Sequence, residues 1–177
     1  MSSPRLRRLR ADHQLIHDMF TGHPYITVEA VQGNPPEKYL VTYRVRGLRW
    51  DSRRSCPVEQ GLHSTEIYLG ADYPREKPKC VMRSDVFHPN FGSYICIGDH
   101  WAAGETLADV IVKIGHMIQY QDYNVKSPLN ALAAAWTAQN EHLLPVGNVG
   151  LYPTEPDLEI ELGPAPADGE DVEITLA

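Results

Sequence analysis

Three cysteines, Cys56, Cys80 and Cys96, carry the most nucleophilic side chains of this sequence. An odd and sparse set does not resemble a disulfide framework, so we expect reduced thiols in a reducing compartment such as the cytoplasm. Cys96 stands between Ile95 and Ile97, where a thiol could be a small buried hydrophobe. Without further context the buried thiol is the more common case, but a thiolate can also carry an acyl group as a thioester, because thiol exchange conserves the activation of that group.

Polar residues on either side of Cys96 could assist such chemistry. His88 and Asn90 precede it, and Asp99 and His100 follow closely enough to share its cleft. Asp99 or His100 could accept the proton of an attacking amine, although loop residues that face solvent are the more common case. A Cys-x3-His pair could also suggest zinc, but a structural site needs four regularly spaced ligands, which the other cysteines do not supply. We predict no metal and no cofactor.

The pattern of apolar residues predicts an α+β fold that must position this segment. Residues 4–21 form an amphipathic opening helix with Pro4 in its first turn. Alternation of apolar and polar residues then predicts a four-stranded antiparallel meander at residues 25–32, 39–46, 65–69 and 79–83, with an irregular stretch before the third strand.

A long loop and two helices complete the predicted domain. Residues 85–105 show no period, and a loop of this length is usually functional or disordered. Thr106 and Asp109 resemble a capping pair for a core helix that reaches about residue 120. Ser127 and Pro128 supply the expected cap and first turn of a final helix through residue 143, with Leu129, Leu132, Ala133 and Trp136 facing inward.

Several short motifs occur in a fixed order along this plan. They are Tyr73-Pro74, Pro78, His88-Pro89-Asn90, Ile95-Cys96, Trp101 and Ser127-Pro128-Leu129-Asn130. In that order the sequence resembles the ubiquitin-conjugating enzyme family over about residues 4–140. The resemblance implies the UBC-like fold and transfer of an activated ubiquitin-like protein through a thioester to an amine.

The resemblance also implies a role for each matching residue. Cys96 matches the acceptor cysteine. Asn90 matches an asparagine that either donates to the oxyanion or braces the loop, and these two readings stay open. His88 matches a residue that is mainly architectural. Ser127 stands where many relatives carry an aspartate that orients the attacking lysine, and Ser supplies no charge, so strong local activation of lysine is in doubt.

The match departs from familiar eukaryotic relatives in length. Five residues separate Asn90 from Cys96 and four separate Cys96 from Trp101, so both loops look shorter and the cleft should be more open. No further long helix is expected after Trp136. In this the chain looks more like divergent bacterial members that are encoded beside ubiquitin-like proteins, some in antiphage operons.

Charge is distributed unevenly and bears on the partners. Residues 145–177 hold eight acidic residues and no Lys or Arg, so the net charge of −7 comes from this end. We expect a conjugating domain over residues 1–144 and an acidic, Pro-rich tail over 145–177 that is flexible or bound to a partner, with residues 170–176 able to add a strand to an exposed sheet edge. The sequence has no broad basic face, so we do not expect nucleic acid as a partner. It also has no long apolar run, so we do not expect a membrane-spanning segment.

The first helix concentrates the positive charge of the body at Arg5, Arg7, Arg8 and Arg10. In the resembled family this region helps to dock the activating enzyme, whereas an ordinary solvated helix face is the alternative. The acceptor protein is not indicated. Two other functions remain open: a non-catalytic binding module of the same fold, and a cysteine hydrolase that pairs Cys96 with His88 or His100.

Overall fold

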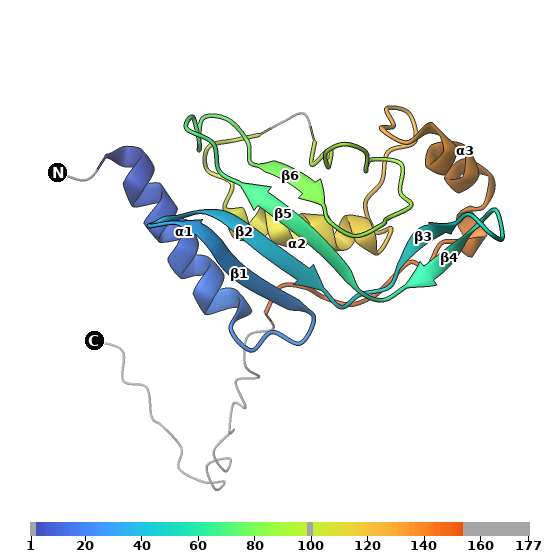
Figure 1. Ribbon diagram of the computed structural model, residues 1–177, viewed down its shortest axis with the longest axis horizontal. Helices are drawn as coiled ribbons and strands as arrows, with labels where there is room; N and C mark the ends of the chain where they lie inside the picture. The colour runs from blue at the N-terminus through green and yellow to red at the C-terminus, as the bar shows by residue number, and fades with distance from the viewer. Residues whose placement is uncertain (1–2, 99–100, 154–177) are drawn as a thin grey trace, which may run out of the picture.

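The computed structural model describes residues 3–98 and 101–153 and has a four-stranded antiparallel sheet at its centre (Figure 1). The sheet runs in the order β1 (Ile26–Gly33), β2 (Pro36–Tyr43), β5 (His63–Tyr68) and β6 (Lys79–Met82). The predicted α+β class and the four-stranded sheet are confirmed, with strand bounds that shift by at most three residues.

Alternation in β2 and β5 determines which face of the sheet is buried. Tyr39, Val41 and Tyr43 of β2 are buried, and they pair with Ile67, Thr65 and His63 of β5, which are buried as well. Because side chains alternate between faces, the inward residues of both strands meet on one side. That side packs against α2 (Leu107–Ile118), where the Tyr43 hydroxyl donates to the Ile111 carbonyl at 3.0 Å.

Each of the two long helices begins at a side-chain cap, of which the sequence predicted the second. α1 (Pro4–Phe20) starts at Ser3, whose side chain accepts from the amide of Leu6 at 3.2 Å. α2 starts at Thr106, and Thr106 and Asp109 form a reciprocal capping box. Residues 85–105 between β6 and α2 contain no helix or strand among those described, apart from an isolated bridge between Phe91 and Ile95.

A second, two-stranded sheet corrects the expected irregular stretch. β3 (Gly47–Asp51) pairs with β4 (Cys56–Gln60) as a hairpin whose turn includes Ser55 at φ 51°. This hairpin extends from the main sheet toward the end of the molecule that carries α3 (Figure 1). Leu48 and Trp50 pack there with Phe87, so the hairpin belongs to a small separate hydrophobic cluster.

The final helix begins later than predicted. α3 spans Ala131–Gln139 and is followed by a 3-10 turn, η1 (Glu141–Leu143). Its cap is Asn130, whose side chain accepts from the amide of Ala133 at 3.0 Å, so the prediction that Ser127 caps this helix is wrong. The prediction that Leu132 faces inward is wrong too, because 56% of it is exposed.

Residues 145–153 stay on the body beyond the boundary expected at residue 144. Leu151 is fully buried in the main core, and the Tyr152 hydroxyl donates to Asp109 of α2 at 3.0 Å. Gly115 of α2 leaves the space that Leu151 fills, since a Cβ there would lie 2.3 Å from the Leu151 side chain. The expected strand at residues 170–176 lies outside the described residues.

Candidate active site

Cys96 lies in the loop between β6 and α2, at a pocket of about 190 Å³. Of the three cysteines, all of which the structure describes, only Cys96 lines this pocket, together with Asn90, Lys113, Asp122, Asn124 and Ser127. The pocket therefore gathers one thiol and several polar groups from the loop before Cys96, from α2 and from the segment after α2.

Backbone hydrogen bonds hold the thiol at the surface. The amide of Cys96 donates to the Asn90 carbonyl at 3.0 Å, and the amide of Ile95 donates to the Cys80 carbonyl on β6 at 2.8 Å. Ile95 and Ile97 are buried, which leaves Cys96 between them only partly buried. The flanking isoleucines thus anchor the loop, and the thiol itself is not a core residue.

The other two thiols lack these surroundings. Cys80 is 2% exposed in the main core, and burial raises the pKa of its thiol to about 12, so it stays protonated and unreactive. Cys56 lies on the separate hairpin, at the first residue of β4. Neither contributes to the pocket around Cys96.

Asn90 ties the Cys96 loop to the segment after α2. Its side-chain nitrogen donates to the carbonyls of Asn124 at 2.9 Å and Ser127 at 3.4 Å, and its side-chain oxygen accepts from the Asn124 amide at 2.7 Å. Asn90 is only 4% exposed. Because both amide hydrogens already have acceptors, this geometry favours loop bracing over oxyanion donation.

His88 is enclosed below this loop. It is fully buried, with its ring centroid 4.5 Å from that of Phe91 and 4.8 Å from that of Tyr120. Its Nδ1 accepts from the Asn90 amide at 3.1 Å, and burial lowers the pKa of the imidazole to about 3. A neutral ring whose Nδ1 is engaged in this way is suited to shaping the loop rather than to accepting a proton from substrate.

Ser127 lines the pocket from the opposite segment and is exposed. The backbone around it is fixed by the amides of Leu129 and Asn130, which donate to the Pro89 carbonyl at 2.8 and 3.0 Å. Together with the bonds of Asn90, these contacts join the two halves of the site. Asp99 and His100, the other candidates, lie outside the described residues.

Three polar side chains of the pocket were not predicted from the sequence: Lys113, Asp122 and Asn124. Lys113 is the one exposed side chain of α2, and its ammonium lies 3.4 Å from the position that a Cβ on Gly98 would occupy. A single lysine in the middle of a mostly apolar helix was the available signal. Asp122 and Asn124 follow α2 without a motif of their own, so only the fold brings them to Cys96.

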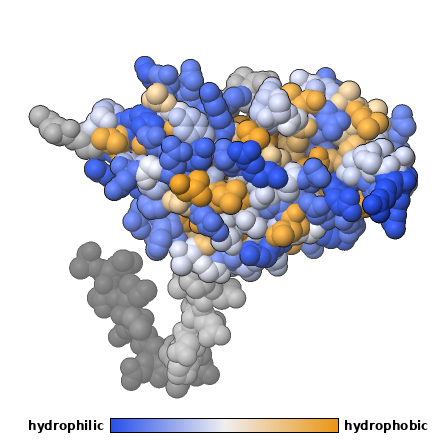
Figure 2. Space-filling view, viewed as in Figure 1, coloured by the Kyte–Doolittle hydropathy of each residue, from blue (hydrophilic) through white to orange (hydrophobic). Residues whose placement is uncertain are grey.

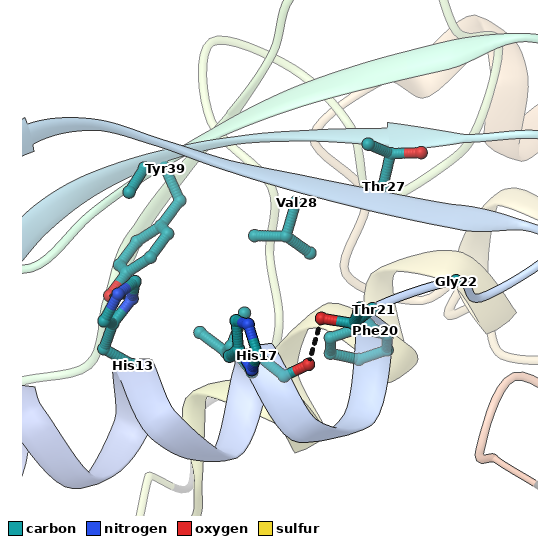
Figure 3. A pocket seen from close by; sticks show the side chains of 10 residues that line it. His13, His17, Phe20, Thr21, Gly22, Thr27, Val28 and Tyr39 are labelled. Carbon is teal, nitrogen blue, oxygen red and sulfur yellow. Dashed lines mark hydrogen bonds between the residues drawn. The ribbon is translucent and has the colours of Figure 1, made fainter.

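A second hollow lies between α1 and β1, away from this chemistry (Figure 3). It has a volume of about 250 Å³ and is lined by His13, His17, Val28 and Tyr39 among others. The Tyr39 hydroxyl approaches Nδ1 of His13 at 3.4 Å. No cysteine lines this hollow, so it offers no alternative carrier thiol.

The sequence matches the family model described as "Ubiquitin-conjugating enzyme" over residues 50–144, which is more than half of the chain. The chain belongs to the ubiquitin-conjugating enzyme family. The matched segment contains Asn90, Cys96 and Ser127, so the pocket described above falls within the part of the chain that carries the family pattern.

Individual members of the family are similar at a lower level. Ubiquitin-conjugating enzyme E2 13 of Saccharomyces cerevisiae is 26% identical over 114 residues, which cover 61% of this chain and 73% of that protein. A ubiquitin-conjugating enzyme E2 of African swine fever virus is 25% identical over 158 residues, or 79% of this chain and 70% of the viral protein. Ubiquitin-conjugating enzyme E2 K of Bos taurus is 29% identical over 93 residues, 49% of this chain and 46% of that protein.

The UBC-like fold and family predicted from the motifs are therefore confirmed. Within the described ranges, no helix is both long and apolar enough to cross a membrane.

Proposed function

We propose that this chain accepts an activated ubiquitin-like protein as a thioester on Cys96 and passes it to an amine of an acceptor protein. The carrying observation is the partly exposed Cys96 in a pocket with Asn90 and Ser127, while Cys80 is sealed in the core. Three unpaired thiols also support a reducing compartment such as the cytoplasm as the place of action.

The reaction divides into two acyl transfers. In the first, the Cys96 thiolate attacks the thioester carbonyl on the activating enzyme and expels that enzyme's cysteine as a thiolate. In the second, an amine attacks the new thioester, an amide bond forms, and Cys96 leaves as a thiolate while the amine gives up its proton. Asp99 or His100 is the proposed proton acceptor, and the Ser127 hydroxyl helps to orient the amine without adding charge.

The activating enzyme is proposed to dock on α1, but the four arginines there are not equivalent. Arg5 pairs with Glu37 at 2.8 Å and also donates to the carbonyls of Leu69 and Gly70. Arg8 pairs with the buried Asp12 at 2.8 Å. Arg7 and Arg10 are exposed, so they carry more of the proposed docking role than Arg5 and Arg8, whose charges hold α1 on the body.

The decisive test is formation of a thioester with the activating enzyme, ATP and the ubiquitin-like protein. We expect a conjugate that a reducing agent removes, that Cys96→Ala abolishes and that the matched control Cys56→Ala retains. Cys96→Ser should trap an ester that resists the reducing agent. A conjugate that persists in Cys96→Ala would overturn the assignment of the carrier thiol.

The two alternative functions give different outcomes in the same assay. A non-catalytic binding module would form no conjugate at all. A cysteine hydrolase would release the ubiquitin-like protein from a fusion substrate without the activating enzyme, and the buried, neutral His88 does not favour that reading. We retain membership of the divergent bacterial branch as part of the proposal, to be tested by whether the genes beside this one encode an activating enzyme and a ubiquitin-like protein.

A further inference from the structure

A third hollow lies beside the Cys96 loop and does not belong to the pocket around the thiol. This groove, of about 630 Å³, is lined by residues of the β5–β6 connection and the start of β6, by Tyr94 and Ile95, and by Trp101. Its volume is within the range of about 300–1,000 Å³ that is usual for binding sites. Tyr94 is 49% exposed.

The groove combines apolar and basic groups. Pro78, Tyr94 and Trp101 contribute apolar surface, and three exposed basic residues, Arg75, Lys77 and Lys79, line it with a single acid, Glu76. Lys77 also donates to the Gly98 carbonyl at 2.8 Å, which connects the groove with the loop that holds Cys96. An occupant should therefore present both apolar and acidic side chains, as an extended segment with alternating residues does.

The end of this chain carries that pattern twice. Residues 157–162 read Asp-Leu-Glu-Ile-Glu-Leu and residues 171–176 read Asp-Val-Glu-Ile-Thr-Leu, and residues 154–177 contain eight acidic residues and no Lys or Arg. In an extended segment alternate side chains point to opposite sides. Val172, Ile174 and Leu176 would then share one side, and Asp171 and Glu173 the other.

The length of chain after Pro153 decides which of the two segments can reach the groove. Pro153 lines the same hollow as Tyr25, which comes just before β1. β1 and β6 are opposite edges of the sheet, about 14 Å apart across three strand spacings. Residues 157–162 begin only four positions after Pro153, which allows about 14 Å of extended chain and leaves none for the path around the body. Residues 171–176 begin about 60 Å of extended chain after Pro153 and can reach the groove.

We propose that residues 171–176 dock in cis in the groove lined by Lys79, Tyr94 and Trp101, next to the Cys96 loop. The apolar side of the segment contacts Tyr94 and Trp101, and its acidic side faces the basic residues. A partner that needs this groove must first displace the chain's own end. The proposal does not depend on the proposed function, because it concerns binding and not thioester chemistry.

Photocrosslinking of the full-length protein tests this directly. A benzoylphenylalanine replaces Tyr94, and mass spectrometry identifies the peptide that it captures; a second protein carries the probe at Leu132, which is exposed on α3. We expect intramolecular crosslinks from position 94 to residues 171–176 and none from position 132. Crosslinks to residues 157–162 instead, crosslinks only between two molecules, or equal yields from both positions would overturn the proposal.

Two matched substitutions in the tail test the proposed orientation. Ile174→Glu places a charge on the apolar side and should lower the crosslink yield about tenfold, because it removes a buried aliphatic side chain. Thr175→Glu adds the same charge on the opposite side and should leave the yield unchanged or raise it. Lys79→Glu should lower the yield, as should high salt, which screens the charge attraction. An equal response to Ile174→Glu and Thr175→Glu would contradict the proposed orientation.

Discussion

Asn90 connects the loop that carries Cys96 with the segment that carries Ser127. Its side chain makes three hydrogen bonds to backbone groups of residues 124 and 127, which is the geometry of a brace. A residue that only stabilised an oxyanion would not need them. The family motif alone left both roles open, and the contacts of this chain favour bracing.

We predict that Asn90→Ala lowers the free energy of unfolding by about 1–3 kcal/mol, because the loop that carries Cys96 loses three hydrogen bonds to the segment after α2. Urea unfolding measures this change. Charging of Cys96 and discharge to an amine, assayed separately, show whether transfer slows as well. Unchanged stability with discharge reduced by about 10²–10³ would instead identify Asn90 as an oxyanion donor.

His88 makes stability depend on pH. Burial lowers its folded-state pKa to about 3, below the value of about 6.5 expected in the unfolded chain. The unfolded state therefore binds more protons between these values, and the contribution of neutral His88 is complete above pH 6.5 and is lost as the pH falls toward 3. Burial lowers the pKa of His63 in the same direction.

We therefore predict that the midpoint of urea unfolding falls steadily from pH 6.5 to pH 4, while the His88 ring stays neutral in the folded protein. NMR of the imidazole nitrogens follows the second point. A His88 ring that titrates near pH 6.5 in the folded state would contradict the assignment.

The residues around Cys96 show how far a sequence can define a site. Cys96, Asn90 and Ser127 lie in short motifs, and the structure brings them to one pocket. Lys113 and Asp122 lie in no motif, and only the packing of α2 against the sheet brings them there. Lys113 stands out in the sequence of α2, but the sequence does not show that its side chain lies at the Cys96 pocket.

A buried carboxylate joins α1 to the rest of the domain. Asp12 is 2% exposed and accepts from Arg8 at 2.8 Å, from the Tyr73 hydroxyl at 2.6 Å and from the amide of Leu107 at 3.3 Å. One side chain thus connects α1, the β5–β6 connection and the first turn of α2. The charge of Arg8 is used mainly inside the domain.

We predict that Asp12→Ala costs about 3 kcal/mol or more of unfolding free energy, because Arg8 would remain partly buried without its partner. The matched control is Asp18→Ala on the same helix, whose exposed carboxylate should contribute less than about 1 kcal/mol. Thermal and urea unfolding compare the two variants. Equal losses of unfolding free energy in the two variants would show that Asp12 does not hold α1 on the domain.

Helices and strands with a regular pattern of apolar residues could be predicted from the sequence. Elements whose position depends on tertiary contacts could not. β2 and β5 alternate, and α2 carries a continuous apolar pattern, so their types were clear from the sequence. The β3–β4 hairpin has no alternation because it lies off the main sheet. Near α3, both Ser127 and Asn130 are good caps, and the hydrogen bonds to the Pro89 carbonyl decide in favour of Asn130.

The folded body of the molecule extends beyond residue 144, where the sequence predicted that the domain ends and the acidic tail begins. The segment that contains Leu151 runs back over α2 to the region where α1 ends and β1 begins. Composition concealed this, because Leu151 stands among prolines and glycines that suggest a tail. A single buried leucine anchors that segment to the core.

We predict that Leu151→Ala destabilises the protein by about 2–5 kcal/mol, the usual cost of emptying a buried leucine site. Val146→Ala is the matched control, since Val146 is 54% exposed and its loss should cost little. Unfolding by urea distinguishes them. Similar stability of both variants would mean that burial of the Leu151 side chain does not stabilise the fold.

Because Cys80 is buried, alkylation of the three cysteines reports on both the active site and the folded state. An alkylating reagent applied briefly to the folded protein can reach Cys96 and Cys56, whereas the protonated, enclosed Cys80 is spared until the core opens. The mass added to each thiol then reports two separate events. Loss of label from Cys96 alone signals that its sulfur is occupied, and gain of label at Cys80 signals that the domain has unfolded.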